Sequence, residues 1–356
     1  MKKFSIFLCT LLLLGILGWQ TTNYIIQRRE LETVYSAEDL ESDYVAITIS
    51  AAGDCTLGTD INSLGSGSFE NEVNAVSHNY SHFLKNVAGI FEQDDLTIVN
   101  FEGTLSLNGT RSNKEFAFRG HPDYVNVITS SSVEAVNLAN NHTRDYGEIA
   151  LSDTKDTMTE NGVVWFEGGN YAITEIDGIK IGLLGTNNQN PEHTANFLQT
   201  LEKVKKENPD LIIASFHWGV ERSLIPEEYQ INLAHSAIDN GVDLVLGHHP
   251  HVLQGIEKYK GKYIVYSLGN FCFGGNKNPA DKDTMIFRQT FLFEGNTLIP
   301  KENVSVIPCS ISSEKGRNNY QPTPLSGSEF KRVKEKLIKI SSGFSGIENI
   351  NFIEKK

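Results

Sequence analysis

The chain has 356 residues, and its 44 acidic against 31 basic side chains give a formal net charge of −13. Hydrophobic residues make up 39% of the sequence, which is enough apolar material for a sizeable core and excludes wholesale disorder. The acidic balance argues against a nucleic-acid binder, which needs basic side chains to neutralise phosphates. Because the chain has only 4 cysteines, a disulfide-built scaffold and a cysteine-rich zinc module are also excluded.

The amino terminus carries an apolar run from Phe4 to Trp19, preceded by Lys2 and Lys3. A membrane-spanning helix needs about 20 apolar residues, whereas the core of a secretory signal has about 7–15. No small-residue cleavage pattern follows the run, so we expect residues 1–19 to be an uncleaved membrane anchor with the two lysines in the cytoplasm. A cleaved signal, which would give a secreted protein, is the alternative. Both interpretations place the bulk of the chain outside the cytoplasm.

The remainder of the sequence predicts a stalk, one folded domain and a C-terminal extension. Polar and charged residues without apolar periodicity fill 20–43, which predicts the stalk. From Tyr44 onward, short apolar and β-branched runs alternate with stretches of helical spacing. This alternation predicts an α/β fold with buried strands. We expect the domain to cover 44–308 and the extension to cover 309–356, with a helix at 328–342.

Six apolar runs are predicted strands, and each one ends abruptly in polar residues. These runs are 44–50, 95–100, 134–139, 210–216, 242–247 and 263–269. Helical spacing lies between them at 78–92, 121–131, 147–161, 193–208 and 226–240. Two hairpins are also predicted, because Asp177-Gly178 and Glu294-Gly295-Asn296 are typical turn sequences.

The residues that follow these strands indicate a metal site. They are Asp54, Glu102, Asn141 with His142, His217, the segment His248–His251, and Asn270. In open α/β sheets, ligand sites form outside the carboxyl ends of the strands, so we expect these side chains to meet. Carboxylate, amide and imidazole ligands together suit Zn, Mn or Fe. No serine-elbow, P-loop or strand-borne G-x-G-x-x-G motif is present, which argues against serine acyl transfer and against nucleotide binding of those types.

The sequence His249-Pro250-His251 favours a shared metal site, because residues i and i+2 of an extended segment point to the same side. Both imidazoles are therefore expected to reach one pair of metals, and His248 is expected to point the other way. A carboxylate that bridges two metals, with a shared water, would supply a nucleophile for phosphoester or related hydrolysis.

Structural interpretations of the same residues remain open. Asp54 would be a turn residue, Glu102 an exposed loop carboxylate, Asn141 a helix cap and His217 a packed core histidine. Each pattern is common outside metal sites, and the convergence of several of them favours the site.

Three further residues are candidates for substrate binding. Arg119 and Arg144 lie next to the polar strand ends and would hold an anionic substrate by bidentate contacts, or would be ordinary surface arginines. Asn270 would bind substrate or fix a turn after Gly269.

Six motifs in sequence order carry a resemblance to a known family. They are GDCTLG (53–58), NFEGTL (100–105), NLANNHTRDYG (137–147), FHWGVE (216–221), GHHPHVLQ (247–254) and YSLGNF (266–271). From about Ile47 to Pro308 the chain resembles the CapA family of capsule (poly-γ-glutamate) biosynthesis proteins, a branch of the calcineurin-like metallophosphoesterase superfamily. The resemblance implies a four-layer metallophosphoesterase-like fold, in which two packed β-sheets are flanked by helices and the metal site lies at strand ends.

The resemblance also implies a role for each site residue. The first divalent metal would be bound by Asp54 and His251, and Glu102 would bridge to a second. The second metal would also be bound by Asn141, His217 and His249. The catalytic histidine, which orients substrate or protonates the leaving group, would be His142.

Two departures from the wider superfamily bear on the number of metals. The Asp-x-His motif of the superfamily is replaced by Asp54-Cys55-Thr56, so one ligand of the first metal is missing. The bridging position carries Glu102 where the superfamily has aspartate. We therefore expect one or two divalent ions (Mn, Zn or Fe).

Three functions are compatible with these observations. The first is a membrane-anchored, extracytoplasmic protein of capsule or poly-γ-glutamate biosynthesis or export, with an anionic polymer as substrate and membrane synthase subunits as candidate partners. The second is a metal-dependent hydrolase of phosphoesters or amides that is unrelated to capsule. The third is a non-catalytic scaffold that recruits membrane synthase subunits.

Overall fold

The computed structural model describes residues 44–188 and 192–355. The predicted anchor (1–19) and stalk (20–43) lie outside the described residues. Within the described ranges, no helix combines the length and the apolar character needed to cross a membrane.

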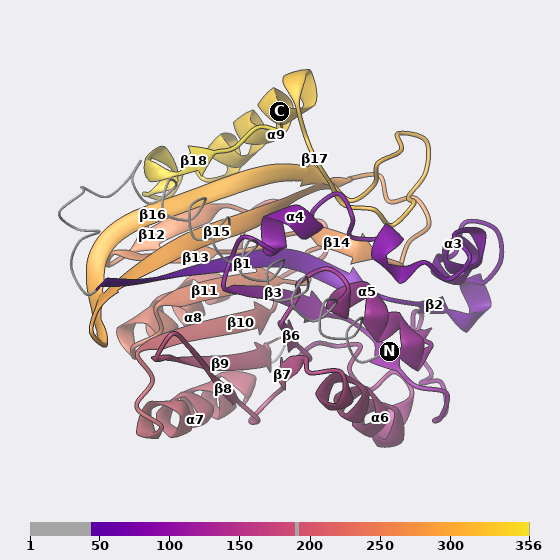
Figure 1. Ribbon diagram of the computed structural model, residues 1–356, viewed down its shortest axis with the longest axis horizontal. Coiled ribbons are helices and arrows are strands. Elements are labelled where there is room, and N and C mark those ends of the chain that lie inside the picture. The colour runs from indigo at the N-terminus through magenta and orange to yellow at the C-terminus, as the bar shows by residue number, and fades with distance from the viewer. Residues whose placement is uncertain (1–43, 189–191, 356) are drawn as a thin grey trace, which may run out of the picture.

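Two β-sheets face each other at the centre of the molecule (Figure 1). In the first sheet, β17, β16, β15, β1, β3, β6 and β7 are neighbours in that order, with β14 paired to β1 and β18 paired to β16. Its strands are β1 (Tyr44–Thr56), β3 (Leu96–Phe101), β6 (Ala135–Asn137), β7 (Val164–Phe166), β14 (Asn270–Phe273), β15 (Asp283–Glu294), β16 (Thr297–Ser310), β17 (Thr323–Pro324) and β18 (Asn351–Phe352).

The second sheet has the order β12, β13, β11, β10, β9 and β8. Its strands are β8 (Ala172–Ile176), β9 (Ile179–Asn187), β10 (Leu211–His217), β11 (Leu244–His248), β12 (Ile256–Tyr259) and β13 (Lys262–Val265). A small third sheet consists of β2 (Thr59–Asp60), β5 (Phe118–Gly120) and β4 (Thr104–Leu105).

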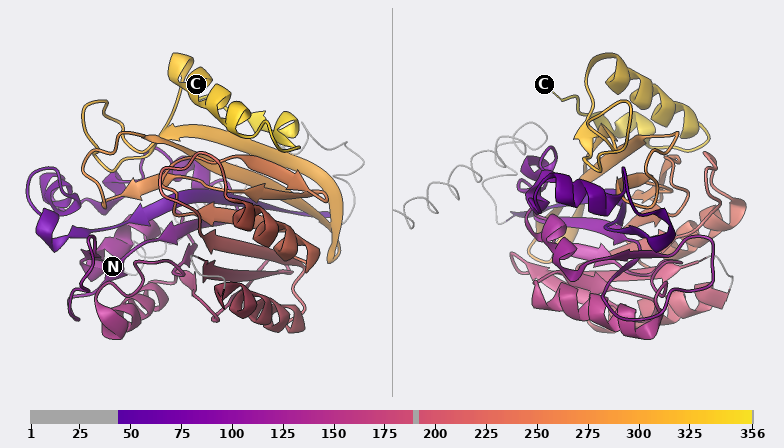
Figure 2. Two further views of the ribbon diagram at one scale, coloured as in Figure 1. Left: turned by 180° about the vertical axis from the view of Figure 1, so that it is seen from behind. Right: turned by 90° about the vertical axis from the view of Figure 1, so that its right-hand side faces the viewer.

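Helices cover the outer faces of both large sheets, as the views in Figure 2 show. The α-helices are α3 (Phe69–Ala75), α4 (Ala88–Phe91), α5 (Val125–Thr129), α6 (Gly147–Glu160), α7 (Glu192–Lys206), α8 (Glu228–Asp239) and α9 (Gly327–Ile340). The 3-10 helices are η1 (Ile61–Ser63), η2 (Tyr80–His82), η3 (Pro122–Tyr124) and η4 (Ile347–Asn349).

Three apolar clusters define the layers. The first lies between the two sheets, where Ile49 of β1 and Ile181 of β9 belong to one buried core. The second lies on the outer face of the first sheet and joins Val99 of β3 to helices α3 and α5. The third lies on the outer face of the second sheet, where Ala214 of β10 packs with Phe197 of α7 and Leu233 of α8. Because successive strand residues face opposite sides, each large sheet contributes side chains to the central cluster and to one outer cluster. The predicted α/β class is confirmed.

Both predicted hairpins are present. Strands β8 and β9 pair antiparallel across Asp177 and Gly178, which adopt φ values of 49° and 81°. Such left-handed values match the two central positions of a tight hairpin turn. Strands β15 and β16 pair antiparallel across Gly295 and Asn296.

Three predicted elements differ from the observed ones. The expected helix at 78–92 is reduced to η2 and α4. Ser77 and His78 have left-handed φ values, which do not occur in a right-handed helix, so no helix begins at His78. The expected strand at 263–269 is shorter than predicted, because β13 ends at Val265, and a separate strand, β14, begins at Asn270 after Gly269 with φ 73°. Helix α3 was not expected, and its Ser68 cap, whose hydroxyl accepts from the Asn71 N–H at 3.2 Å, is its local signal.

Residues beyond 308 add to the first sheet. Strand β17 pairs antiparallel with β16, and β18 pairs parallel with it. Helix α9 is fixed to β15 by ion pairs, because Arg332 donates to both carboxylate oxygens of Asp283 at 2.6 and 2.9 Å and Lys336 donates at 2.8 Å.

Candidate metal centre

Parallel strand pairing brings distant parts of the sequence to one edge of the molecule. In the first sheet, Asp54 at the end of β1 pairs with Asn100 of β3, and Glu102 follows two residues later. In the second sheet, His217 at the end of β10 pairs with His248 of β11. The carboxyl ends of parallel strands lie side by side, so the polar residues that follow each strand converge.

Two groups of side chains meet there, and both contain Glu102. In the first group the ligand atoms of Asp54, Glu102 and His251 lie within 4.8 Å of one another. In the second group the same holds for Glu102, His217 and His249. These are the sets that the family resemblance assigns to two metals bridged by Glu102. The structure brings the side chains together, and their roles as ligands stay a prediction.

Asn141 extends the second group. Its Oδ1 lies 2.7 Å from Nε2 of His217, and the same Nε2 lies 3.4 Å from Oε1 of Glu102. An amide oxygen, a carboxylate oxygen and an imidazole nitrogen therefore surround one point, which is a donor set that a borderline-hard divalent metal accepts.

The segment after β11 reaches the site by a different geometry from the one predicted. His249 and His251 are not in an extended strand, because they adopt φ values of 96° and 58° in a turn that begins where β11 ends. The turn still brings their rings to 5.7 Å between centroids. The expectation that His248 points away is wrong, since its Nδ1 lies 3.6 Å from Oδ1 of Asp54. Left-handed backbone costs non-glycine residues about 1–3 kcal/mol and concentrates at functional sites.

The two carboxylates at the centre are completely buried, yet they are not equivalent. Burial tends to raise the pKa of Asp54, but the neighbouring imidazoles of His248 and His251 outweigh burial and hold this pKa well below its usual value. For Glu102, burial prevails and raises the pKa to about 8. Its Oε1 is a buried atom that makes no hydrogen bond.

The histidines divide in the same way. Burial lowers the pKa of His217 well below its usual value and lowers the pKa of His249 to about 4, so both rings are neutral. Burial also tends to lower the pKa of His251, but the charges of Glu102 and Asp54 raise it to about 9. The neutral imidazoles of His217 and His249 and the unsatisfied oxygen of Glu102 fit a divalent cation, which would displace the protons of Glu102 and His251 on binding.

Buried asparagines hold Asp54 in place, and the sequence analysis did not single them out. The Nδ2 of Asn100 donates to Oδ1 of Asp54 at 2.8 Å, and the Nδ2 of Asn137 donates to Oδ1 of Asn100 at 3.0 Å. Both asparagines lie in the motifs NFEGTL and NLANNHTRDYG, and this position was the one sequence feature that could have indicated their role. This chain of amides fixes the orientation of the carboxylate, as partners of metal ligands commonly do.

His142 has a carboxylate partner that was also missed. Its Nδ1 donates to Oδ2 of Asp145 at 2.7 Å, and Lys114 donates to the other oxygen at 2.5 Å. The imidazole packs on the Phe118 ring, with centroids 4.3 Å apart. Burial lowers the pKa of His142 and outweighs the opposing effect of Asp145. The ring is thus held in one orientation and is mainly neutral.

The predicted substrate-binding residues occupy three different environments. Asn270 lies inside the site, where its Oδ1 is 2.9 Å from Nδ1 of His251 and its Nδ2 donates to the His251 carbonyl at 3.2 Å. The guanidinium of Arg119 lies 4.2 Å above the Tyr146 ring. Arg144 is paired with Glu148 at 2.5 Å and with Glu167 at 3.0 Å.

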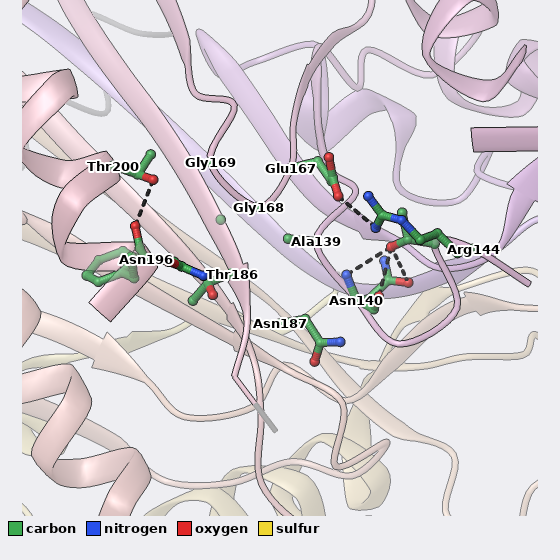
Figure 3. A pocket seen from close by; sticks show the side chains of 13 residues that line it. Ala139, Asn140, Arg144, Glu167, Gly168, Gly169, Thr186, Asn187, Asn196 and Thr200 are labelled. Atoms are coloured by element: carbon green, nitrogen blue, oxygen red, sulfur yellow. Dashed lines mark hydrogen bonds and ion pairs between the residues drawn. The ribbon is translucent and has the colours of Figure 1, made fainter. Parts of the chain in front are cut away.

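Figure 3 shows Arg144 directed toward Glu167 at the wall of a separate cavity of about 280 Å³. Binding of substrate by Arg119, Arg144 and Asn270 stays a prediction.

A third group of potential ligands adds a residue that was not predicted. The ligand atoms of Glu221, His249 and His251 also lie within 4.8 Å of one another. Glu221 is exposed, whereas the other carboxylates of the site are buried. It is the last residue of the motif FHWGVE, so it was within a quoted motif although no role was assigned to it.

Comparison with known proteins places the chain in a family. The sequence model of the family described as "Bacterial capsule synthesis protein PGA_cap" matches residues 48–275. The capsule biosynthesis protein CapA of Bacillus anthracis is 27% identical over 293 residues, which are 74% of this chain and 67% of that protein. The PGA biosynthesis protein CapA of Bacillus subtilis is 30% identical over 212 residues, 52% of this chain and 55% of that protein.

A third relative is the probable polyglutamine synthesis accessory protein of Mycobacterium tuberculosis, which is 26% identical over 208 residues, 49% of this chain and 55% of that protein. The chain therefore spans just over half the length of the second and third relatives. The family match covers more than half of the chain and contains all six motifs. The chain belongs to the bacterial capsule synthesis protein family PGA_cap.

Proposed function

We propose that the protein is a membrane-anchored, metal-binding protein that acts outside the membrane on poly-γ-glutamate during capsule biosynthesis or export. The observation that carries this proposal is the meeting of two potential ligand groups at Glu102 in a chain of the PGA_cap family. The names of the Bacillus relatives, which refer to capsule and PGA biosynthesis, support the polymer as the substrate. Membrane synthase subunits are the proposed partners.

The proposed cofactor is one or two ions of Mn, Zn or Fe at a metallophosphoesterase-like centre. The four layers, with polar residues gathered at the carboxyl ends of the strands, support this likeness. When bound, such an ion supplies Lewis acidity and a nucleophilic water at neutral pH. The protein contributes the buried ligands around Glu102, the amide chain that orients Asp54, and a fixed neutral imidazole at His142.

The proposed location is the cell membrane, with a single N-terminal anchor and the folded domain on the outer side. The apolar run from Phe4 to Trp19 behind two lysines supports the anchor. A secreted protein is the alternative. Fractionation of cells that produce the tagged full chain separates the two, because an anchored chain stays with membranes after an alkaline wash and a secreted chain is found in the medium.

A second candidate function is a metal-dependent hydrolase of phosphoesters or amides unrelated to capsule. It is favoured by the pairing of His142 with Asp145, since a histidine oriented by a carboxylate suits proton transfer to a leaving group. It predicts turnover that both Glu102→Gln and His249→Ala abolish. Turnover that survives both changes would rule it out.

Deletion of the gene tests the proposed role directly. We expect the deletion strain to change in the amount, length or attachment of surface poly-γ-glutamate, and the wild-type gene to restore it. A Glu102→Gln gene is expected to fail, whereas Glu228→Gln, which makes the same charge change on an exposed helix position, is expected to succeed. Unchanged surface polymer in the deletion strain would overturn the proposal. Full restoration by Glu102→Gln would favour a scaffold without metal chemistry.

A further inference from the structure

A second cavity opens beside the metal centre and has a different character. It has a volume of about 810 Å³ and lies between helix α8 and the segment that follows β10. His249 and Glu221 line it, and both also belong to groups of potential metal ligands. A molecule in this cavity would therefore touch the wall of the metal centre. The volume is in the range of cavities that bind small molecules, which is about 300–1,000 Å³.

Amide and hydroxyl groups project from several elements around this cavity. Asn188 is buried, and its backbone N–H donates to the carbonyl of His217 at 2.9 Å. This hydrogen bond places Asn188 beside the metal centre. Among the residues that the structure describes, the side chain of Asn188 contacts the Thr194 hydroxyl, at 3.4 Å, and its amide has further donor and acceptor capacity. Asn232 and Ser236 line the helix α8 side.

Apolar groups supply the rest of the wall. Leu233 of α8 and Val220 of the segment after β10 line the cavity, together with the ring of Tyr229. The Tyr229 hydroxyl accepts from the Gly219 N–H at 2.5 Å, so the ring is fixed over this segment. Val220 is 54% exposed and Tyr229 is 41% exposed, so both have surface available to a ligand.

The charge of the lining limits what can bind. Among the described residues that line the cavity, Glu221 is the one carboxylate, and none is a lysine or an arginine. Among the described lining residues, a glutamate side chain that entered would meet the like charge of Glu221 and no basic side chain, which disfavours its binding. A neutral amide would instead find amide and hydroxyl partners next to an apolar wall.

We propose that this cavity binds a secondary-amide group that has an apolar flank and no carboxylate beside it. The ligand of the metal centre would then carry such a group beside its reacting part, in place of an unbroken run of free glutamate carboxylates. The inference rests on the proposed metal centre, because it assigns the neighbouring subsite of the same ligand. Two sources supply this chemistry, a neutral peptide and an N-acylated sugar.

Titration of the full-length chain with three probes tests the proposal. The probes are N-acetylalanine methylamide, N-acetylglucosamine and a γ-linked glutamate trimer, and binding is followed by NMR of the side-chain amides of Asn188 and Asn232. We expect at least one neutral probe to shift these signals saturably and the trimer to leave them unchanged. The neutral probe with the higher affinity identifies the source as peptide or sugar. Binding of the trimer alone, or of no probe, would overturn the proposal.

Variants connect the binding to the cavity. Asn232→Trp fills the cavity from an exposed position and is expected to weaken the neutral probe at least tenfold. Glu228→Trp places the same bulk on the same helix outside the lining, and the affinity is expected to stay unchanged. Equal affinities in these two variants would contradict the assignment.

Binding of a neutral probe can be separated from the capsule role, because it needs neither turnover nor polymer. If a neutral probe binds while deletion of the gene leaves the surface polymer unchanged, the cavity assignment stands and the capsule role fails. If deletion alters the polymer and no neutral probe binds, the cavity assignment fails alone.

Discussion

Oε1 of Glu102 lies 3.4 Å from Nε2 of His217, and both side chains are completely buried. This contact is not an ordinary ion pair, because burial keeps the pKa of His217 well below its usual value and leaves the ring neutral. A buried carboxylate is costly to ionise, and this cost, which exceeds the attraction of His251, is what raises the pKa of Glu102 to about 8. A cation between the two side chains would remove the cost.

Glu102→Gln should therefore have opposite effects with and without metal. In the metal-free protein, the raised pKa of Glu102 means that stability falls as pH rises from about 4.5 to about 8, since the unfolded state releases the proton first. At pH 8.5 we expect the variant to be more stable than the wild type by about 1–3 kcal/mol. With Mn or Zn added, the wild type should gain stability and the variant should not.

Urea unfolding at pH 8.5, with a chelator and with added metal, measures both effects. Glu228→Gln is the control, because it removes an exposed carboxylate on α8 and should leave both values unchanged. A Glu102→Gln protein that is less stable than the wild type in chelator would show that Glu102 has a counter-charge other than metal.

Asp145→Asn tests how His142 is held. The carboxylate of Asp145 accepts from Nδ1 of His142 and favours the charged ring, so its loss should lower the pKa of His142 further. NMR of the imidazole nitrogens should also show a mixture of tautomers in the variant, where the wild type has the proton on Nδ1. Metal content should stay unchanged. An unaltered pKa and tautomer would mean that Phe118 packing alone positions the ring.

The sequence predicted the residues that meet at the site better than the way in which they meet. Asp54 and His217 lie at the carboxyl ends of the buried strands β1 and β10, and Glu102 directly follows β3. The carboxyl ends of parallel strands share an edge, so the convergence of these residues could be expected. The left-handed turn at His249 and His251 could not, because alternation along a strand applies only while the backbone stays extended.

The partners of the site residues were harder to predict for a related reason. Asn100 and Asp145 make their contacts across the fold or within a loop, and a single sequence shows residue types and spacing but not such contacts. The short helix α3 was missed because its few residues give too little periodicity to recognise.

Gly53→Ala should displace the first strand end. A Cβ at residue 53 would lie 1.9 Å from the carbonyl oxygen of Gly269. Because this oxygen belongs to the backbone, the clash can be relieved only if a strand or the segment at Gly269 moves. The Asp54 N–H donates to that same oxygen at 2.9 Å, so the metal centre would be disturbed together with the strand. We expect a loss of about 3 kcal/mol or more in the free energy of unfolding.

Gly89→Ala is the matched control for this change. Gly89 lies in α4, and nothing lies within 4 Å of a Cβ at this position. Replacement of a helical glycine by alanine is expected to stabilise by about 0.5–1 kcal/mol. Equal unfolding midpoints of the two variants would contradict the close approach of Gly53 and Gly269.

Asp94→Asn should change the pH dependence of stability away from the metal centre. Burial raises the pKa of Asp94 to about 7, and its Oδ2 accepts from the Thr97 hydroxyl at 2.8 Å. The folded state thus retains a proton that the unfolded state releases near pH 4, so this group lowers stability as pH rises from about 4 to about 7. The asparagine variant lacks the titration and should gain about 1–2 kcal/mol on the wild type over that range. Parallel stability curves from pH 4 to 8 would show that Asp94 titrates normally.

The metal content of the purified chain tests the central claim most directly. After equilibration with Mn, Zn or Fe(II) and removal of free ions, elemental analysis should find at least one divalent ion per wild-type chain. His249→Ala should hold clearly less, and His121→Ala, which removes an exposed imidazole outside the potential ligand groups, should match the wild type. A wild-type chain that retains no more metal than His249→Ala would contradict the assignment of this site as a metal centre.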